Sequence, residues 1–369
     1  MTFSESFRAG PPPAAALRRF AALLEPDADL EAAAREAQLL TRRHFGKTMR
    51  LFAPLYLSNE CINICKYCGF SRDNPILRTT LTVDQVETEA RHLAAEGFRN
   101  LLLVAGEHPK FVSEGYMAEC VARIRPFVPS VSLEVAPMET EAYLPLTAAG
   151  AEGLVVYQES YDREAYAELH TAGPKRDFDW RLDTPERAYA AGFRRLGIGA
   201  LFGLAPWRTE AMALAAHAAH LLKHCWKASL TISLPRLKPA AGDFAPRHPF
   251  TDRDFVQLLC ALRIAFPQVG LVLSTRERPA FRDALANLGV TMMSAGSHTE
   301  PGGYTGAGRD TLHRTEKGRA VSLAESEKEA TATEQFSVSD ERSPAQVAAR
   351  LRELGLEPVW KDWEVCLGA

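Results

Sequence analysis

Several hallmarks of other protein classes are missing from this chain of 369 residues. No apolar run reaches the roughly 18–20 residues of a membrane-spanning helix, and the N-terminus lacks the apolar core of a signal peptide. Positive charge is not in excess, because 43 Lys and Arg residues face 46 Asp and Glu residues, whereas nucleic-acid partners favour a basic surface. We therefore expect a cytoplasmic protein that binds neither membranes nor nucleic acid.

Cysteine is scarce, with seven in the chain, and in a reducing cytoplasm we do not expect these to form a disulfide framework. Three of them, Cys61, Cys65 and Cys68, lie close together in "ECINICKYCGF". The fourth ligand that a closed tetrahedral zinc site requires is missing. The other cysteines are isolated, and we expect them to be small buried hydrophobic residues: Cys120, Cys225, Cys260 and Cys366.

A dinucleotide-binding fingerprint is also missing, since no G-x-G-x-x-G follows the first predicted strand. Short apolar segments alternate with amphipathic ones instead, which predicts strands separated by helices. This pattern favours an α/β fold of the TIM-like (β/α)8 barrel type, with an open doubly wound sheet as the alternative. The eight predicted strands are residues 50–57, 99–105, 131–136, 153–158, 195–201, 229–235, 270–275 and 290–295.

Helix signals divide the chain further. Thr82 and Gln85 have capping-box spacing before a helix at 83–96, other helices begin at Thr184 and Thr251, and a C-terminal helix is predicted at about 343–354. Residues 305–333 contain no aromatic residue, and this composition predicts a mobile loop that resists packing. We expect an N-terminal helical extension (1–49), the barrel (50–300) and a C-terminal extension (301–369).

The three clustered cysteines follow the first strand, which places them at the catalytic end of a barrel. Three thiolates can hold three irons of a [4Fe–4S] cluster and leave the fourth iron open to a ligand. The C-x3-C-x2-C motif, with Tyr67 before the last cysteine, resembles the signature of the radical S-adenosylmethionine (SAM) superfamily. The resemblance implies that the cluster binds SAM and cleaves it to methionine and a 5′-deoxyadenosyl radical. A non-enzymatic zinc-binding module is a remote alternative.

Polar residues at successive strand ends resemble the SAM contacts of that superfamily. Glu107 in "AGEHP" resembles the acid that meets the SAM amino group, Glu134 in "SLEVAP" the ribose contact, and Arg181 in "RLDT" the biotin synthase arginine that meets the SAM carboxylate. The cofactor-binding residues that we predict on this basis are Tyr67, Gly106, Glu107, Glu134, Arg181 and Gly199.

Longer phrases resemble one family within the superfamily, the ThiH-type tyrosine lyases (2-iminoacetate synthases) of thiamine thiazole biosynthesis. They include "YQESYD", "GPKRDFDWRLDTPERA", "EQFSVSDER" and "PVWKDW". The resemblance implies cleavage of the Cα–Cβ bond of L-tyrosine to 2-iminoacetate and p-cresol, with no catalytic residue beyond the cluster and the SAM-derived radical. Tryptophan lyases and deazaflavin synthases are the related alternatives. A hydrogenase maturase would need more cysteines late in the chain than the single Cys366 beyond Cys260.

The tyrosine carboxylate requires an anchor, and we favour Arg276 in "STRE" over Arg236 and Ser297. The resemblance also implies a reductant such as flavodoxin or ferredoxin, and a ThiG-like thiazole synthase as a partner. The substrate-binding residues that we predict are Tyr157, Gln158, Glu159, Arg236, Arg276 and Ser297.

Overall fold

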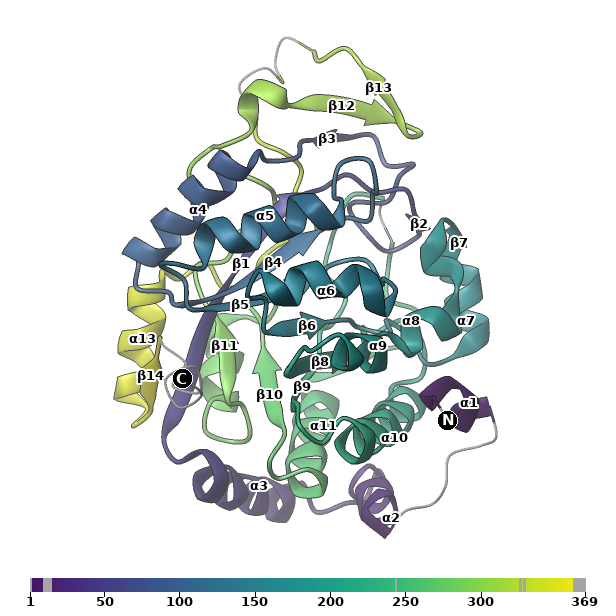
Figure 1. The fold of residues 1–369 in the computed structure, drawn as a ribbon. Coiled ribbons are helices and arrows are strands. Elements are labelled where there is room, and N and C mark those ends of the chain that lie inside the picture. Colours follow the sequence, from purple (N-terminus) through teal and green to yellow (C-terminus); the bar gives the residue numbers. More distant parts are fainter. Residues whose placement is uncertain (1, 9–14, 243, 325–326, 328–329, 361–369) are drawn as a thin grey trace.

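A closed barrel of eight parallel strands forms the centre of the computed structural model, which describes residues 2–8, 15–242, 244–324, 327 and 330–360 (Figure 1). Every predicted strand is confirmed. Strand β11 pairs with β1, with Met293 opposite Leu51, so the sheet closes on itself and the open-sheet alternative is wrong. The strands are β1 (Thr48–Ser58), β4 (Asn100–Ala105), β5 (Ser130–Glu134), β6 (Gly153–Val155), β8 (Arg195–Gly199), β9 (Ser229–Ser233), β10 (Gly270–Leu273) and β11 (Met292–Ser294).

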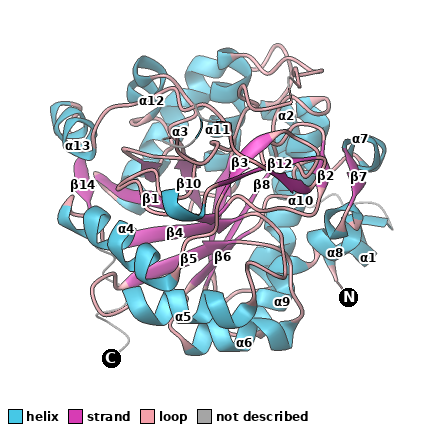
Figure 2. Ribbon diagram, turned by 90° about the horizontal axis from the view of Figure 1, so that it is seen from above, coloured by secondary structure: helices cyan, strands magenta, loops and turns pink. Residues whose placement is uncertain are grey.

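Helices surround the barrel, as the view along another direction shows (Figure 2). The predicted capping box of Thr82 and Gln85 is present at α4, and Thr251 caps α11. Each helix buries an apolar face against the strands, which is how parallel strands become covered on their outer side. The helices are α4 (Val83–Ala95), α5 (Glu114–Ile124), α6 (Thr140–Ala148), α9 (Thr184–Ala190), α10 (Trp207–His224), α11 (Asp252–Ala265) and α12 (Pro279–Leu285).

Three helices precede the barrel: α1 (Phe3–Arg8), α2 (Ala15–Leu23) and α3 (Leu30–Phe45). Helices α2 and α3 pack on α11, and in Figure 1 they lie at the end of the barrel opposite β12 and β13. Ser4 of α1 donates its backbone N–H and its hydroxyl to the carboxylate of Asp183, at 2.8 and 2.6 Å. No helix in the described part of the chain is long and apolar enough to cross a membrane.

The C-terminal region contains the predicted helix, α13 (Pro344–Glu353), with Ser343 and Gln346 as its capping box. Strand β14 (Glu357–Val359), which the sequence does not predict, follows it. Its residue Pro358 lies opposite Met49, so β14 runs parallel to the start of β1, outside the eight-stranded barrel. The C-terminal region is thereby joined to the strand from which the cysteine loop emerges.

The segment predicted as a mobile loop, 305–333, contains regular structure, so the prediction is wrong for its middle part. It forms a short 3-10 turn, η2 (Arg309–Thr311), and a hairpin of β12 (His313–Glu316) and β13 (Arg319–Val321). Strand β12 pairs with β3 (Ile76–Arg78), and the hairpin extends beyond the barrel mouth (Figure 1). Backbone hydrogen bonds order this segment without an apolar core of its own, which composition alone does not reveal.

Candidate active site

The cysteine loop starts where β1 ends at Ser58, at the barrel mouth. Cys61, Cys65 and Cys68 are free thiols, and Cys65 is buried. Two local hydrogen bonds fold the loop: the Cys68 N–H donates to the Cys65 carbonyl at 3.2 Å, and the Ser71 N–H donates to the Cys68 carbonyl at 3.0 Å. The loop therefore presents three thiols from one tight turn.

Arg78 of β3 fixes the backbone of this loop from inside. Its side chain is fully buried and donates to the carbonyls of Asn59, Phe70 and Ser71. Its Nε donates to the Thr315 hydroxyl at 2.6 Å, so the β12 hairpin supports the same arginine. Burial lowers the pKa of Arg78. A cation that satisfies three backbone carbonyls sets the path of the loop on which the thiols lie.

The donor set fits an iron–sulfur cluster. Burial raises the pKa of the Cys65 and Cys68 thiols, so binding of iron there must displace protons. Among the described residues, no three His, Cys, Asp or Glu side chains are arranged to hold a single metal ion. A cubane binds each thiolate to a different iron, so its ligands need not converge on one point.

Gly106 and Glu107, predicted to contact SAM, lie directly against the cysteine loop. A Cβ atom on Gly106 would stand 2.2 Å from the Glu60 carbonyl oxygen, so only glycine fits there. The Glu107 carbonyl accepts the Ile62 N–H at 2.8 Å, and its carboxylate accepts the Asn63 side-chain amide at 2.7 Å. The same amide nitrogen lies 3.7 Å from the Cys61 sulfur, so Asn63 links the Glu107 carboxylate to one of the three thiols.

A cavity of about 690 Å³, partly open to solvent, occupies the barrel mouth. Four of the predicted residues line it: Glu134, Tyr157, Arg276 and Ser297. The sequence did not identify several other lining residues, which are Tyr56, Ser233, Ser274, Gln335 and Phe336. The Tyr157 hydroxyl donates to Ser233 Oγ at 3.0 Å, and the Tyr56 hydroxyl donates to Gln335 Oε1 at 2.8 Å.

Three charged or polar side chains that line this cavity can bind a ligand: Glu134, Arg276 and Ser297. Burial raises the pKa of Glu134 to about 7, and the negative charge of Glu159 adds to the effect. The Arg276 guanidinium lies 3.3 Å from the centre of the Phe336 ring and, among the described residues, has no hydrogen-bond or ion-pair partner. Burial lowers the pKa of Arg276. The Ser297 hydroxyl is buried and likewise has no hydrogen-bond partner in the described part of the chain.

Residues 333–340 run across the mouth and form part of the cavity wall; we call them the cover segment. Four backbone amides attach it to the barrel: Gln335 donates to Thr299, Ser337 to Pro239, and both Ser339 and Asp340 to Thr275, at 2.9 to 3.1 Å. The position of this segment therefore decides where Gln335 and Phe336 stand.

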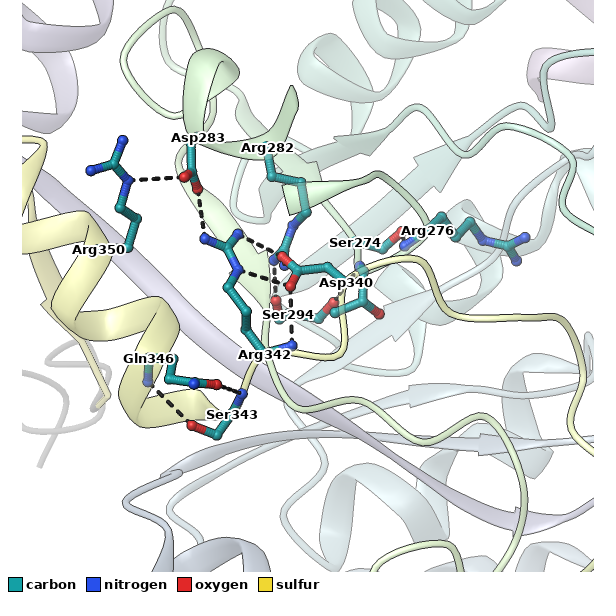
Figure 3. Close-up of polar contacts among 11 residues, drawn as sticks. Ser274, Arg276, Arg282, Asp283, Ser294, Asp340, Arg342, Ser343, Gln346 and Arg350 are labelled. Carbon is teal, nitrogen blue, oxygen red and sulfur yellow. Dashed lines mark hydrogen bonds and ion pairs between the residues drawn. The ribbon is translucent and has the colours of Figure 1, made fainter. Parts of the chain in front are cut away.

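Asp340 anchors the end of the cover segment, as Figure 3 shows. Its carboxylate pairs with Arg282, and both side chains are fully buried. Arg342 also donates to it, with Nη2 at 2.7 Å. Arg342 and Arg350 both donate to Asp283, at 3.0 and 2.9 Å, which links the anchor to helices α12 and α13.

Glu159, Lys175 and Arg181 form a cluster of charged residues near the cysteine loop. Glu159 has a positive φ of 71°, unusual for a residue with a side chain. Its Oε1 lies 2.6 Å from Lys175 Nζ and 3.4 Å from Arg181 Nη2. Burial acts to raise the pKa of Glu159, but the two cations outweigh burial and hold it below its usual value. Arg181 also donates Nε to the Tyr157 carbonyl at 2.7 Å.

Lys175 is the functional candidate that sequence reasoning missed. It lies in 3-10 turn η1 (Pro174–Arg176), within "GPKRDFDW", and a single lysine in such a phrase is usually a solvated surface residue. Here its side chain is only 14% exposed. The signal that could have indicated it is its place in the phrase shared with Arg181.

Other predicted residues do not reach the mouth cavity. Arg236 pairs with Glu277 and Asp252 and lines a separate cavity next to Phe250, so the structure does not bring it to the substrate candidates. The buried amide of Gln158 donates to the Phe178 carbonyl at 3.3 Å. Both residues follow a strand end, but their side chains are committed elsewhere.

Tyr67 and Gly199 support the site through packing. The Tyr67 hydroxyl lies 2.8 Å from His170 Nε2. Burial lowers the pKa of His170 to about 3, so its ring is neutral. A Cβ atom on Gly199 would approach the Tyr157 ring to 2.8 Å, so glycine at this position makes room for Tyr157. The isolated cysteines Cys120, Cys225 and Cys260 are buried as expected, and Cys366 lies outside the described residues.

Comparisons with known proteins agree with this geometry. Residues 55–213 match the Radical SAM superfamily and residues 233–357 match the Biotin and Thiamin Synthesis associated domain. The chain is 41% identical to the 2-iminoacetate synthases of Escherichia coli (strain K12) and Salmonella typhimurium (strain LT2), over 94% of its length and 87% of theirs.

Two solved structures share the fold. The [FeFe]-hydrogenase maturase HydG from Carboxydothermus hydrogenoformans is 33% identical with a TM-score of 0.83, covering 97% of this chain and 78% of that one. Methylornithine synthase (PylB) is 18% identical with a TM-score of 0.71, covering 96% of each chain. The second likeness concerns the fold alone.

Proposed function

Because the chain belongs to the 2-iminoacetate synthase family of radical SAM enzymes, we propose a role for each part of its site in the cleavage of L-tyrosine. The protein is a radical SAM tyrosine lyase that uses a [4Fe–4S] cluster and SAM. Its products are 2-iminoacetate and p-cresol. The observation that carries this conclusion is the 41% identity over 94% of the chain, combined with three free thiols at the barrel mouth.

Cys61, Cys65 and Cys68 are the residues that we propose hold the cluster. When bound, the cluster supplies an electron to SAM, and SAM supplies the group that takes a hydrogen atom from the substrate. The chain contributes orientation: Arg78 fixes the loop backbone, and Glu107 fixes Asn63 beside the Cys61 sulfur.

SAM requires an acceptor for its ribose hydroxyls and a cation for its carboxylate. We assign the first role to Glu134, which faces the cavity and has no hydrogen-bond partner among the described residues. We assign the second to Arg181, which is buried close to the cysteine loop. Tyr67 and Gly199 shape this side of the site by packing, and Gly106 allows the loop to approach β4.

The tyrosine carboxylate requires a cation with free donors. Arg276 follows β10 and Ser297 follows the neighbouring strand β11, and both line the mouth cavity. Since neither side chain has a hydrogen-bond partner in the described part of the chain, we propose that together they bind the carboxylate. Arg236 is not included, because Glu277 and Asp252 already engage its guanidinium.

A radical SAM lyase also requires a one-electron reductant. We propose flavodoxin or ferredoxin for this role, a ThiG-like thiazole synthase as the acceptor of 2-iminoacetate, and the cytoplasm as the location. The match of residues 233–357 to a domain associated with biotin and thiamin synthesis supports the thiamine assignment.

An anaerobic assay tests the proposal. The protein is reconstituted with iron and sulfide and incubated with SAM, dithionite and tyrosine, and with tryptophan in a parallel reaction. We expect p-cresol and 5′-deoxyadenosine from tyrosine, and neither product from Cys61→Ala. Deoxyadenosine without p-cresol would remove tyrosine as the substrate but keep the reaction class, and an aromatic product from tryptophan alone would reassign the enzyme to the tryptophan lyases.

A further inference from the structure

Lys175 is a buried cation next to the cysteine loop, and none of the roles assigned above uses it. A two-stranded ribbon brings it there: β2 (Ile64–Cys65) pairs with β7 (His170–Ala172), with Cys65 opposite His170. Beyond the ribbon, the Lys175 N–H donates to the side-chain oxygen of Asn63 at 2.9 Å. The backbone of Lys175 is therefore held against the loop that carries the thiols.

Glu159 keeps Lys175 charged and in place. The ammonium lies 2.6 Å from Glu159 Oε1, and the two side chains are only 14% and 12% exposed. Burial and the nearby Arg181 act to lower the pKa of Lys175, but Glu159 together with the Cys65 and Cys68 sulfurs raises it above its usual value. Lys175 is therefore a protonated cation of this site near neutral pH.

The charge of Lys175 acts on the cluster ligands. The ammonium lies 5.7 Å from the centre of the Tyr67 ring, whose residue stands between Cys65 and Cys68 in the chain. The pairing of Cys65 with His170 and the bond from the Lys175 N–H to Asn63 hold this cation beside the loop that carries the thiols. Because the field of a charge is screened weakly in a buried site, the ammonium favours negative charge at the nearby sulfurs.

A [4Fe–4S] cluster on three thiolates becomes more negative by one charge when it accepts an electron. Water stabilises such a charge poorly inside a protein, whereas a buried cation nearby stabilises it strongly. We propose that Lys175, held by Glu159, is the positioning residue that makes the cluster easier to reduce by the one-electron donor. This inference rests on the proposed function for the presence of the cluster, but not on the identity of the amino acid that is cleaved.

A matched lysine provides the control. Lys66 adjoins Cys65 in the chain, but its side chain is 41% exposed and lies 3.6 Å from Glu168. Water and salt screen a charge in that position. Comparison of Lys175→Met with Lys66→Met therefore separates a buried counter-charge from a lysine that is merely close in sequence.

The test measures the reduction potential of the reconstituted cluster by anaerobic redox titration with EPR detection, without SAM or tyrosine. We expect Lys175→Met to decrease the equilibrium constant for reduction at least tenfold, which is about 59 mV for one electron. Lys66→Met should change it less than threefold. A change in Lys175→Met no larger than in Lys66→Met would overturn the inference.

Two further variants keep the test decisive if Lys175→Met does not retain its iron. Lys175→Arg preserves the charge and should keep a potential close to that of the wild type. Lys175→Gln, which removes the charge but keeps a polar side chain, then decides: a potential below that of Lys175→Arg supports the inference, and an equal or higher one contradicts it. A wild-type protein that forms the cluster but no p-cresol would defeat the choice of tyrosine and leave this comparison intact.

Discussion

The Arg276 guanidinium lies over the ring of Phe336, its carbon 3.3 Å from the centre of the ring. The arginine follows barrel strand β10, whereas the phenylalanine belongs to the cover segment that crosses the mouth. A cation–π contact of this kind holds a guanidinium in place while its donors stay free. The cation that we assign to the tyrosine carboxylate is thus positioned by a residue outside the barrel, and this coupling underlies the first two predictions.

Arg276→Lys should weaken tyrosine binding while cleavage of SAM continues. Lysine keeps the charge but loses the planar fork and the stacking on Phe336. We expect KM for tyrosine to rise about tenfold to a hundredfold, as the loss of a charged hydrogen bond costs roughly 1.5–3 kcal/mol. Steady-state assays of p-cresol and 5′-deoxyadenosine check this. The control is Arg278→Lys, whose side chain is 60% exposed; equal KM values in the two variants would refute the carboxylate assignment.

Asp340→Asn should loosen the cover segment. The change leaves Arg282 buried and without its carboxylate (Figure 3), and breaking such a pair typically costs about 3–5 kcal/mol. We expect the free energy of unfolding to fall by that amount in urea titrations and KM for tyrosine to rise, because Phe336 loses its fixed position. Asp283→Asn is the control, since its carboxylate is 19% exposed and should cost less. A variant as stable as the wild type and with an unchanged KM for tyrosine would show that Asp340 does not hold Phe336 in position.

Glu134→Gln should change stability in a pH-dependent way. The pKa of Glu134 is raised from 4.5 to about 7 by burial, so the native state binds a proton more tightly than the unfolded chain. Stability from this group is therefore present at low pH and lost as pH rises toward 7. Removing the charge should stabilise the cluster-free protein at pH 8, by up to roughly 3 kcal/mol, and have little effect at pH 5. Thermal unfolding at both pH values checks this. Equal Tm shifts at the two pH values would contradict the raised pKa of Glu134.

Arg78→Met should prevent the cysteine loop from holding iron. The substitution leaves three buried carbonyls, those of Asn59, Phe70 and Ser71, without their donor, and each unpaired buried group costs about 1–3 kcal/mol. We expect the iron content after reconstitution to fall well below that of the wild type. Arg72→Met, on the same loop but with a side chain that is 41% exposed, should retain iron. Full iron loading in Arg78→Met would show that the loop keeps its shape without the arginine.

The barrel was predictable because most of its strands lie in short segments rich in apolar residues, such as those around Leu51 in β1 and Met293 in β11. The ribbon of β2 and β7 and the strand β14 were not, because each is only two or three residues long and, unlike the three-residue strands β6 and β11, does not lie in a longer apolar segment. Segments this short have no periodicity of their own. The ribbon nevertheless brings Lys175 to the cysteine loop, and β14 joins the C-terminal region to β1.

Part of the site was also predictable, because some of its residues directly follow predicted strands. The position of a residue after a parallel strand predicts which end of the barrel it occupies, and this placed Glu134, Arg276 and Ser297 correctly at the mouth cavity. It does not predict where a side chain points. Arg236 also follows a strand, but two carboxylates, on Glu277 and Asp252, draw it into another cavity. Phe336 was missed because its role depends on a contact between distant parts of the chain.

The cover segment also has a consequence for the order of events during synthesis. Cys61, Cys65 and Cys68 leave the ribosome long before Gln335, whose backbone lies against Gly69 at the end of their loop. Because domains generally fold as units, the cysteine loop gains its complete wall only after residue 335 has been synthesised. A chain that stopped short of the cover segment would therefore leave the loop open on this side.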